Sequence, residues 1–208
     1  MKKFIVLFFI LFANTTTLAQ KIDTIIKTKW FQSYYSYTLK TPVYVVYDIW
    51  KGGGSCDRGS SSFKTGNISK SARAKDYSKS GFDQGHLVPF EDLAFDCKAA
   101  ESTFFFYNAI PQYPNLNRGE WKKWEFIVRE VSKRDSLKII TGGSKWTTTI
   151  GDGVAVPDYC WKVVWSKSQK VVIYALLFEN KAENGKVSKE TISTLEKKIG
   201  FKVRHHLK

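Results

Sequence analysis

The sequence predicts a single domain that contains both strands and helices. Runs of β-branched and aromatic residues end at clusters of glycine, serine or lysine, which is typical of strands joined by hairpins. Two other segments repeat apolar residues at three- and four-residue spacing, which is typical of amphipathic helices. The chain has 208 residues, of which 43% are hydrophobic, and this supplies enough apolar material for one core. Disorder and a repetitive fibre are therefore excluded.

Residues 1–19 have the three parts of a secretory signal peptide. Two lysines follow Met1, an apolar run extends from Phe4 to Ala13, and small residues precede a cleavage position after Ala19. The apolar run is shorter than a membrane-spanning helix needs, and a retained N-terminal anchor is the alternative. We therefore expect a single mature domain over residues 20–208, secreted or periplasmic, with no membrane anchor after cleavage.

The first half of the mature chain is predicted to contain two strands and a long loop. Residues 42–50 are β-branched and aromatic throughout and end at three glycines, which predicts a strand. Residues 51–81 are rich in glycine, serine and lysine, which indicates a surface loop, either functional or a flexible insertion. The apolar run Thr103–Tyr107 predicts a short buried strand before a turn region that contains prolines.

A helix is predicted to begin near Gly119. Its apolar stripe is formed by five residues at helical spacing, namely Trp121, Trp124, Ile127, Val128 and Val131. We expect the two tryptophans to be core residues rather than platforms for stacked bases. Glu125 and Arg129, four residues apart, share another face, and an ordinary exposed ion pair is the alternative to a functional pair.

The second half is predicted to form three more strands and a final helix. The strands are Leu137–Thr141, Tyr159–Trp165 and Val171–Phe178, with turn residues between them that fit hairpins or a meander. The helix is predicted to have Ser188 as its N-cap, with Val187 and Ile192 as a hydrophobic staple, and to end at Gly200. Lys202–Lys208 is predicted to be a solvated end.

Charge points to an anionic partner. The chain has 33 lysines and arginines against 19 aspartates and glutamates, a formal net charge of +14. Most of these cations are lysines, which act as point charges rather than as planar groups that form paired hydrogen bonds. We therefore expect an anionic partner that is recognised by its charge.

The three cysteines, Cys56, Cys97 and Cys160, are predicted to be architectural. In an oxidising compartment they allow one disulfide and one free thiol, and the sequence does not choose among the three pairings. Their spacing does not fit a structural zinc site.

Two segments are hard to explain by packing. In Phe82–Pro89, His86 directly follows a glycine and is the only histidine outside the C-terminal tail. The segment Asn108–Trp121 places three asparagines and a glutamine between an apolar run and the predicted helix. Buried amides are costly unless they form hydrogen bonds, so these side chains are expected to bind something.

The residue types in these segments predict phosphodiester hydrolysis. A histidine such as His86 can take a proton from water near neutral pH, and a nearby acid such as Asp83 can fix its tautomer. An asparagine oxygen suits a cation that keeps most of its waters, as Mg²⁺ does. Glu125 can hold those waters, and Arg129 can neutralise charge on the pentacovalent phosphorus.

These segments resemble the DNA/RNA non-specific endonucleases of the ββα-metal (His-Me finger) superfamily. Residues 83–89 match the family pattern D-R-G-H, an apolar residue and a later proline, with Gln84 in place of the arginine. The residues that follow the family order downstream are Asn108, Pro111, Gln112, Asn117, Trp121, Glu125 and Arg129. The resemblance covers residues 40–203.

The resemblance implies an α+β fold with a central, mainly antiparallel sheet flanked by helices. A ββα-metal finger would place His86, the general base, opposite Asn117, the direct Mg²⁺ ligand, with Mn²⁺ as a substitute. Glu125 would contact the metal-bound waters. The alternatives are an ordinary surface or core histidine for His86 and a helix N-cap for Asn117.

Further residues carried over from the resemblance are expected to support the metal or the phosphate. They are Asn108, Gln112 and Arg129, and Arg58 and Arg73 are both candidates for an additional phosphate-contacting arginine. Gln84 lacks the charge of the family arginine, which is expected to affect the rate more than the type of reaction.

The sequence therefore predicts a secreted Mg²⁺-dependent endonuclease that cleaves DNA and RNA with little sequence preference. No element carries the side chains that reading of base edges in the major groove would require. One alternative is a non-catalytic module that binds nucleic acid or acidic polysaccharide through its lysines. The other is a sequence-specific or structure-specific nuclease toxin. The sequence does not identify protein partners.

Overall fold

The computed structural model describes residues 21–207, and the predicted signal peptide therefore lies outside the described residues. One sheet contains the strands β1 (Thr24–Lys27), β2 (Phe31–Ser36), β3 (Thr41–Ile49), β6 (Leu137–Ile150), β7 (Val154–Ser166), β8 (Val171–Glu179) and β9 (Val187–Lys189). A hairpin pairs β4 (Asp83–His86) with β5 (Ala109–Gln112). The α-helices are α1 (Ala74–Tyr77), α2 (Cys97–Glu101), α3 (Lys122–Ser132) and α4 (Ile192–Ile199).

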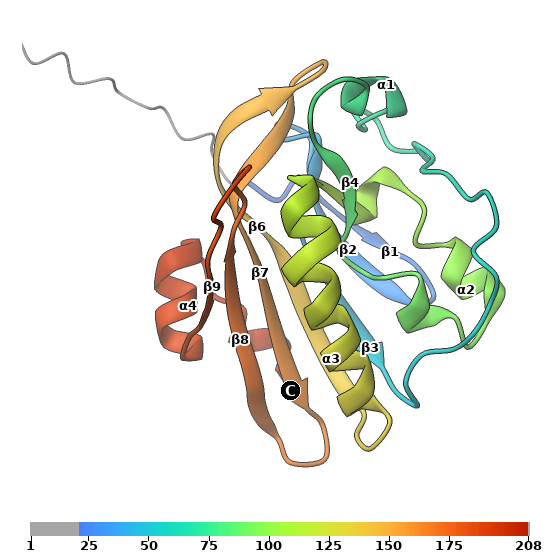
Figure 1. The fold of residues 1–208 in the computed structure, drawn as a ribbon, viewed down its shortest axis with the longest axis vertical. Helices are drawn as coiled ribbons and strands as arrows, with labels where there is room; N and C mark the ends of the chain where they lie inside the picture. The colour runs from blue at the N-terminus through green and yellow to red at the C-terminus, as the bar shows by residue number, and fades with distance from the viewer. Residues whose placement is uncertain (1–20, 208) are drawn as a thin grey trace, which may run out of the picture.

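The fold is α+β, as predicted. The large sheet has the order β1-β2-β3-β6-β7-β8-β9 and each of its neighbouring pairs is antiparallel. Helix α3 lies across this sheet, and the β4 strand lies close to its N-terminal end (Figure 1). The site-bearing hairpin and the predicted amphipathic helix are therefore adjacent.

Neighbouring side chains of β7 contact elements on opposite faces of the sheet. The ring of Trp161 lies 5.4 Å from that of Phe201 in the C-terminal segment. The next residue, Lys162, has its ammonium 4.6 Å from the ring of Trp121, directly before α3. Because neighbouring side chains of a strand point to opposite faces, α3 and the C-terminal segment cover opposite sides.

Trp121 and Trp124 are core residues, as predicted, and are 1% and 8% exposed. Trp121 packs against Phe178 of β8, and Trp124 packs against Tyr174 of the same strand. Burying an aromatic side chain contributes about 1.5–3 kcal/mol. These contacts fix α3 on the sheet and so define which of its residues face outward.

The strand predicted over Thr103–Tyr107 is wrong. Phe105 forms a single bridge with Lys64, and a 3₁₀ helix follows at Phe106–Asn108. Phe104 and Phe106 enter two small core clusters, and Tyr107 belongs to the main core. The strand of this region, β5, begins directly afterwards.

Helix α3 begins later than predicted. A π-helical segment, Leu116–Trp121, precedes it, and the backbone at Gly119 is not helical. Asn117 lies inside this segment, so its predicted alternative role as an N-cap is not observed. The π-helical turn directs Asn117 to the side of the helix that faces the β4–β5 hairpin, since Asn117 donates a hydrogen bond to Asp83.

The C-terminal helix has a different N-cap from the one predicted. The Oγ1 atom of Thr191 accepts the capping hydrogen bond, whereas Ser188 belongs to β9. The predicted end is confirmed, because Gly200 adopts a left-handed conformation with φ of 85°. The tail is not fully solvated, since Val203 is buried and His206 bonds to the Tyr44 hydroxyl at 3.1 Å.

The segment 51–81 is mostly irregular and exposed, as predicted, although it includes α1. A disulfide between Cys56 and Cys97 ties it to α2, and Cys160 is a free, buried thiol. Within residues 21–207, no helix has the length and apolar character to cross a membrane.

Candidate active site

The β4–β5 hairpin brings the two unusual sequence segments together. Its register pairs Asp83 with Gln112 and His86 with Ala109. A Cβ atom at Gly85 would lie 2.1 Å from the Gln112 side-chain oxygen, which is closer than atoms can approach. The glycine before the histidine is therefore required by the glutamine on the paired strand.

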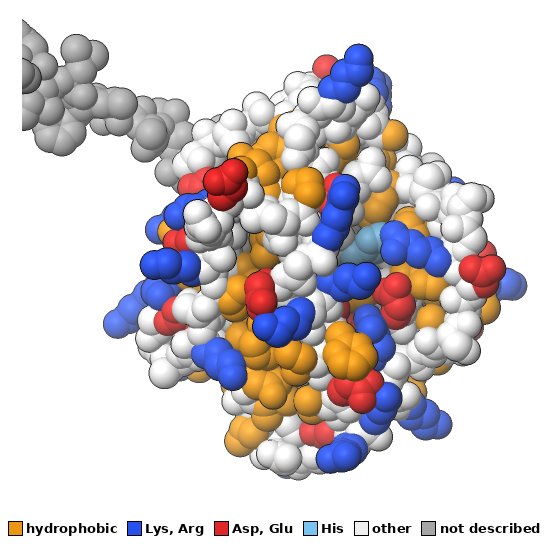
Figure 2. Space-filling view, in the orientation of Figure 1, with side chains coloured by type: hydrophobic (Ala, Val, Ile, Leu, Met, Phe, Trp, Pro, Cys, Tyr) orange, Lys and Arg blue, Asp and Glu red, His pale blue; other side chains and the backbone are white. Residues whose placement is uncertain are grey.

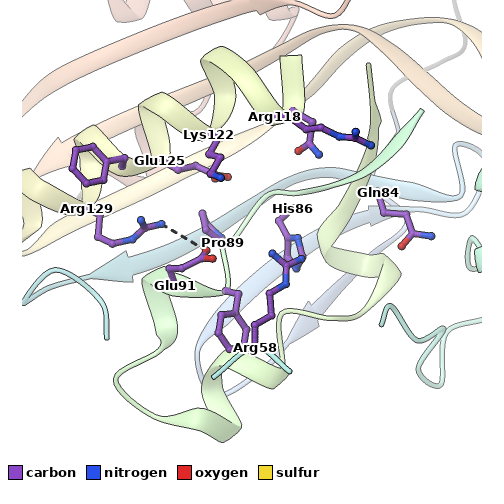
Figure 3. A pocket seen from close by; sticks show the side chains of 12 residues that line it. Arg58, Gln84, His86, Pro89, Glu91, Arg118, Lys122, Glu125 and Arg129 are labelled. Atoms are coloured by element: carbon purple, nitrogen blue, oxygen red, sulfur yellow. Dashed lines mark ion pairs between the residues drawn. The ribbon is translucent and has the colours of Figure 1, made fainter. Parts of the chain in front are cut away.

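A cavity of about 600 Å³ lies between this hairpin and α3 (Figure 3). It is lined by Arg58, Gln84, His86, Pro89, Phe90, Glu91, Asn117, Arg118, Lys122, Glu125, Phe126 and Arg129. Lysine and arginine side chains gather around a hollow on this face of the molecule, in which a histidine is visible (Figure 2). The structure thus brings together five of the predicted site residues and surrounds them with positive charge.

His86 is enclosed by aromatic rings. The ring centroids of Phe63 and Phe104 lie 4.5 and 4.9 Å from its own. Burial, together with the positive charge of the nearby Arg58, lowers the pKa of His86 to about 3. Its Nε2 atom has no hydrogen-bond partner among residues 21–207. The imidazole is therefore neutral at physiological pH and has a nitrogen free to accept a proton.

Arg58 extends from the irregular segment to the His86 ring (Figure 3). It lies two residues after Cys56, so the disulfide to Cys97 anchors the backbone that carries it. Its guanidinium carbon lies 5.1 Å from the ring centroid of Phe104, one of the rings that enclose His86. Of the two arginines that the sequence left open, Arg58 reaches the cavity, whereas Arg73 does not line it.

Asp83 orients Asn117 rather than His86. Its Oδ2 atom accepts a hydrogen bond from Asn117 Nδ2 at 2.9 Å. Arg118 donates to both carboxylate oxygens, at 2.8 and 2.7 Å. Burial alone would raise the pKa of Asp83, but the bonds from Arg118 and Asn117 hold it below its usual value. The expectation that Asp83 fixes the His86 tautomer is corrected, because both of its oxygens accept hydrogen bonds from Asn117 and Arg118.

The Asn117 amide fits a hydrated divalent cation. Because its nitrogen is used by Asp83, the amide oxygen is the atom left for the cavity. In the described part of the chain, no group of three or more His, Cys, Asp or Glu side chains could hold a metal ion. A metal here would be bound by Asn117 and by its own waters. Mg²⁺ typically binds in this way, because it keeps several waters and takes few protein ligands.

Arg129 is held by an aspartate that the sequence did not indicate. Its Nε atom donates to Asp92 at 2.9 Å, and its Nη2 atom lies 3.8 Å from Glu91. The other Asp92 oxygen accepts from the Tyr47 hydroxyl at 2.8 Å. The predicted alternative of a simple Glu125–Arg129 ion pair is therefore wrong, since Arg129 pairs with Asp92 and Glu91.

Lys162 is a second charged residue that sequence reasoning missed. It is fully buried, and its ammonium has no hydrogen-bond partner within residues 21–207. Burial raises the pKa of Glu125 to about 7, against the opposing positive charge of Lys162. A lysine in an otherwise apolar strand, Cys160–Val164, was the available signal for this arrangement.

Asn108 and Gln112 lie outside the cavity and are fully buried. The Asn108 amide bonds to both backbone groups of Val88 and to the Thr103 carbonyl, at 2.9 to 3.0 Å. Gln112 packs against Gly85 and donates to the Cys160 sulfur at 3.4 Å. The predicted substrate contacts are corrected for both, because buried side chains engaged in this way position the hairpin instead.

The β4–β5 hairpin and helix α3 face one cavity. The hairpin carries a histidine, and an asparagine lies just before the helix. This arrangement defines the ββα-metal class of nuclease folds. Residues 11–208 match the family described as DNA/RNA non-specific endonuclease, and the chain belongs to that family.

Curated relatives include mitochondrial nucleases. The mitochondrial nuclease EXOG of Xenopus laevis is 33% identical over 144 residues, which cover 60% of this chain and 40% of the relative. Human EXOG is 31% identical over 66% of this chain and 42% of its own length. Nuclease C1 of Cunninghamella echinulata is 34% identical over 60% of this chain and 56% of its own length. The chain thus matches about half, or less, of each of these relatives.

A solved structure shares the fold. A chain of the crystal structure of the EndoG/EndoGI complex, which concerns EndoG inhibition, superimposes with a TM-score of 0.76 and 21% identity. The match covers 86% of this chain and 85% of that one.

Replacing Asp83 with asparagine is expected to raise the Mg²⁺ concentration needed for half-maximal cleavage by about 10- to 100-fold. The substitution removes the charged acceptor that orients Asn117 and binds Arg118. The measurement is a Mg²⁺ titration of plasmid cleavage. Glu120→Gln, which removes a surface carboxylate paired with Lys123, is the control and should leave the titration unchanged. An Asp83→Asn titration that overlays the wild type would contradict the role in orienting Asn117.

Proposed function

We propose that the chain is an exported, metal-dependent endonuclease that hydrolyses phosphodiester bonds in DNA and RNA with little sequence preference. The observation that carries the proposal is the meeting of His86 and Asn117 in one cavity lined by arginines and a lysine. A neutral imidazole and a free amide oxygen supply a base and a metal ligand, and the cations supply phosphate binding.

His86 Nε2 takes the proton of the attacking water, because its low pKa keeps that nitrogen unprotonated before substrate binds. A phosphodiester anion beside the imidazole favours the protonated form, so the pKa rises when it is needed. The Asn117 oxygen would hold Mg²⁺, and Glu125 would accept hydrogen bonds from its waters. When bound, the hydrated ion supplies positive charge for the leaving oxygen. Arg58 and Arg129 face the same cavity and offset the charge that develops on phosphorus.

Gln84 and Arg118 lie at the same end of the cavity, and Arg129 lies at the other (Figure 3). Gln84 supplies no charge where the family pattern has an arginine. The Arg118 side chain is 72% exposed and its guanidinium is fixed in place by Asp83. It therefore places a guanidinium, paired with the Asp83 carboxylate, at the end where Gln84 is neutral.

Export is supported by the predicted signal peptide and by the Cys56–Cys97 disulfide, since disulfides persist in oxidising compartments. Curated relatives are named as mitochondrial, so their location does not transfer directly to this chain. The leader pattern of this sequence supports secretion or a periplasmic location.

The deciding experiment is cleavage of supercoiled plasmid and of RNA with Mg²⁺, with Mn²⁺ and with EDTA. The proposal expects metal-dependent nicking that proceeds to a smear of fragments, and loss of activity in EDTA. Discrete fragments would indicate sequence or structure specificity instead. Binding of plasmid without cleavage in either metal would establish a polyanion-binding module and overturn the proposal.

Binding should weaken steeply as salt rises, because the cavity offers four cations to phosphates. With about four phosphate contacts, the dissociation constant is expected to rise about 100-fold between 50 and 200 mM salt. Fluorescence anisotropy with a labelled oligonucleotide in EDTA measures it. Lys122→Ala should reduce the slope of the log–log plot by about one. A flat salt dependence would refute recognition by charge.

A further inference from the structure

Phe126 is an exposed aromatic side chain at the candidate active site. It lies on α3 and is 58% exposed. The other large hydrophobic side chains exposed in the described part of the chain are Ile22, Ile25, Trp50, Phe95 and Val171. None of these lines the cavity that contains His86, whereas Phe126 does. Core packing does not explain Phe126, because Trp121, directly before the helix, and Trp124, within it, are the residues that pack against the sheet.

Two cations flank Phe126 on the same side of the helix. Lys122 lies four residues before it and Arg129 three residues after it, which are the spacings at which helical side chains are neighbours. Both cations line the same cavity as Phe126. An aromatic face between two positive charges matches a nucleotide strand, in which each base is flanked by phosphates. Proteins that bind single strands without reading sequence combine these two elements.

Phe126 marks only one end of the site. A second cavity of about 530 Å³ continues beyond His86 and shares Arg58, Gln84, Asn117 and Arg118 with the first. Phe126 does not line this second cavity. A bound strand can therefore extend past His86 and Asn117 in both directions, with the exposed aromatic ring on one side only.

We propose that Phe126 is a base-stacking subsite that takes an unpaired nucleobase on one side of the scissile phosphodiester. The inference rests on the proposed function and deepens it. A base can lie flat on Phe126 only after it leaves the duplex stack, so the subsite favours single-stranded DNA and RNA, or locally unpaired duplex, over fully paired duplex. Because every base has a π-face, the subsite adds affinity without adding sequence specificity.

The test uses single-stranded oligonucleotides with one cleavable phosphodiester, protected by phosphorothioates elsewhere. Three substrates are compared: the complete strand, a strand with an abasic tetrahydrofuran on the 5′ side of the cleavable bond, and one with it on the 3′ side. The enzymes are wild type, Phe126→Ala, Phe126→Leu, which keeps apolar bulk without a ring, and Phe126→Trp. Val171→Ala, an exposed apolar residue outside both cavities, is the control.

We expect Phe126→Ala to raise KM for the complete strand about tenfold, equivalent to about 1.4 kcal/mol, with Phe126→Leu close to alanine and Phe126→Trp close to wild type. This increase in KM should disappear on one of the two abasic strands and persist on the other. Cleavage of fully paired duplex should change less than twofold. Three outcomes would each overturn the subsite. Phe126→Ala could raise KM equally on all three substrates, or leave KM for the complete strand unchanged. The Phe126→Leu variant could have the wild-type KM.

Failure of the subsite is distinguishable from failure of the proposed function. The same variants are measured for binding to the three strands in EDTA by fluorescence anisotropy. Suppose that the wild type shows no cleavage, yet binds the complete strand more tightly than one abasic strand. If Phe126→Ala removes this difference in affinity, the stacking subsite stands without catalysis. If wild type cleaves normally and the difference is absent in both assays, the nuclease stands and the subsite fails.

Discussion

Replacing His86 with alanine is expected to lower kcat for plasmid cleavage by about 10²- to 10⁴-fold, which is the usual contribution of a general base. Its Nε2 atom is the free acceptor in the cavity beside Asn117, and its neutral form is secured by burial between Phe63 and Phe104. DNA binding should change less than twofold, because the cations that line the cavity remain. Single-turnover cleavage and fluorescence anisotropy measure the two quantities.

The matched control is His205→Ala, which removes an exposed histidine of the C-terminal tail. It should cleave plasmid at the wild-type rate. Thermal unfolding of His86→Ala tests whether the aromatic enclosure survives, since an alanine leaves space between two rings. A folded His86→Ala protein that still cleaves at more than a tenth of the wild-type rate would remove His86 from the role of general base.

Much of the site could be predicted because two separate sequence segments match one family pattern. Gly85 and Gln112 depend on each other through the hairpin, so the two sequence segments that contain them carry a readable pattern. Helical spacing placed Glu125 and Arg129 on one face, and the family resemblance supplied their expected roles. The family resemblance assigned Asn117 to the metal, and Asn117 faces the cavity. The sequence could not show that Asn108 holds the hairpin from behind instead of supporting the metal or the phosphate.

Elements with weak local patterns were missed. Strand β2 has the sequence Phe-Gln-Ser-Tyr-Tyr-Ser, and two of its buried residues are serines. The Ser33 hydroxyl donates to the carbonyl of Tyr107, 74 residues away. Conversely, the apolar run at Thr103–Tyr107 has strand composition but no neighbouring strand to pair with beyond a single bridge. Both errors have one cause, since strand formation depends on partners that local composition does not specify.

The buried charges beneath α3 were also beyond the sequence. Tyr47 comes from β3, Asp92 from a 3₁₀ helix after the histidine motif, and Lys162 from β7. Only the folded chain brings them under Glu125 and Arg129. Removing one charge from such a group leaves others uncompensated, and this makes the group sensitive to a single substitution.

Replacing Lys162 with methionine is expected to move the acidic limb of the kcat/KM profile to higher pH by about 1 to 3 pH units. Burial raises the pKa of Glu125 to about 7, and the Lys162 charge opposes that rise. Asp92 and Glu91 also raise this pKa, whereas Arg129 lowers it, so three of these four neighbours remain in the variant. Without Lys162 the pKa of Glu125 rises further, and more alkaline solution is needed to form its carboxylate.

The direction in which the acidic limb moves shows whether Glu125 or His86 is the group that titrates. Because burial holds the pKa of His86 at about 3, protonation of the free histidine does not contribute to a limb near neutral pH. Methionine retains the length and apolar stem of lysine, so the variant is expected to fold, as thermal unfolding can check. Lys197→Met, which removes an exposed charge from α4, should leave the profile in place. A folded Lys162→Met protein with the wild-type profile would show that the buried ammonium does not set the ionisation of Glu125. A limb that moved to lower pH would show that the limb belongs to a group other than Glu125, because losing a cation can only raise the pKa of a neighbouring carboxyl.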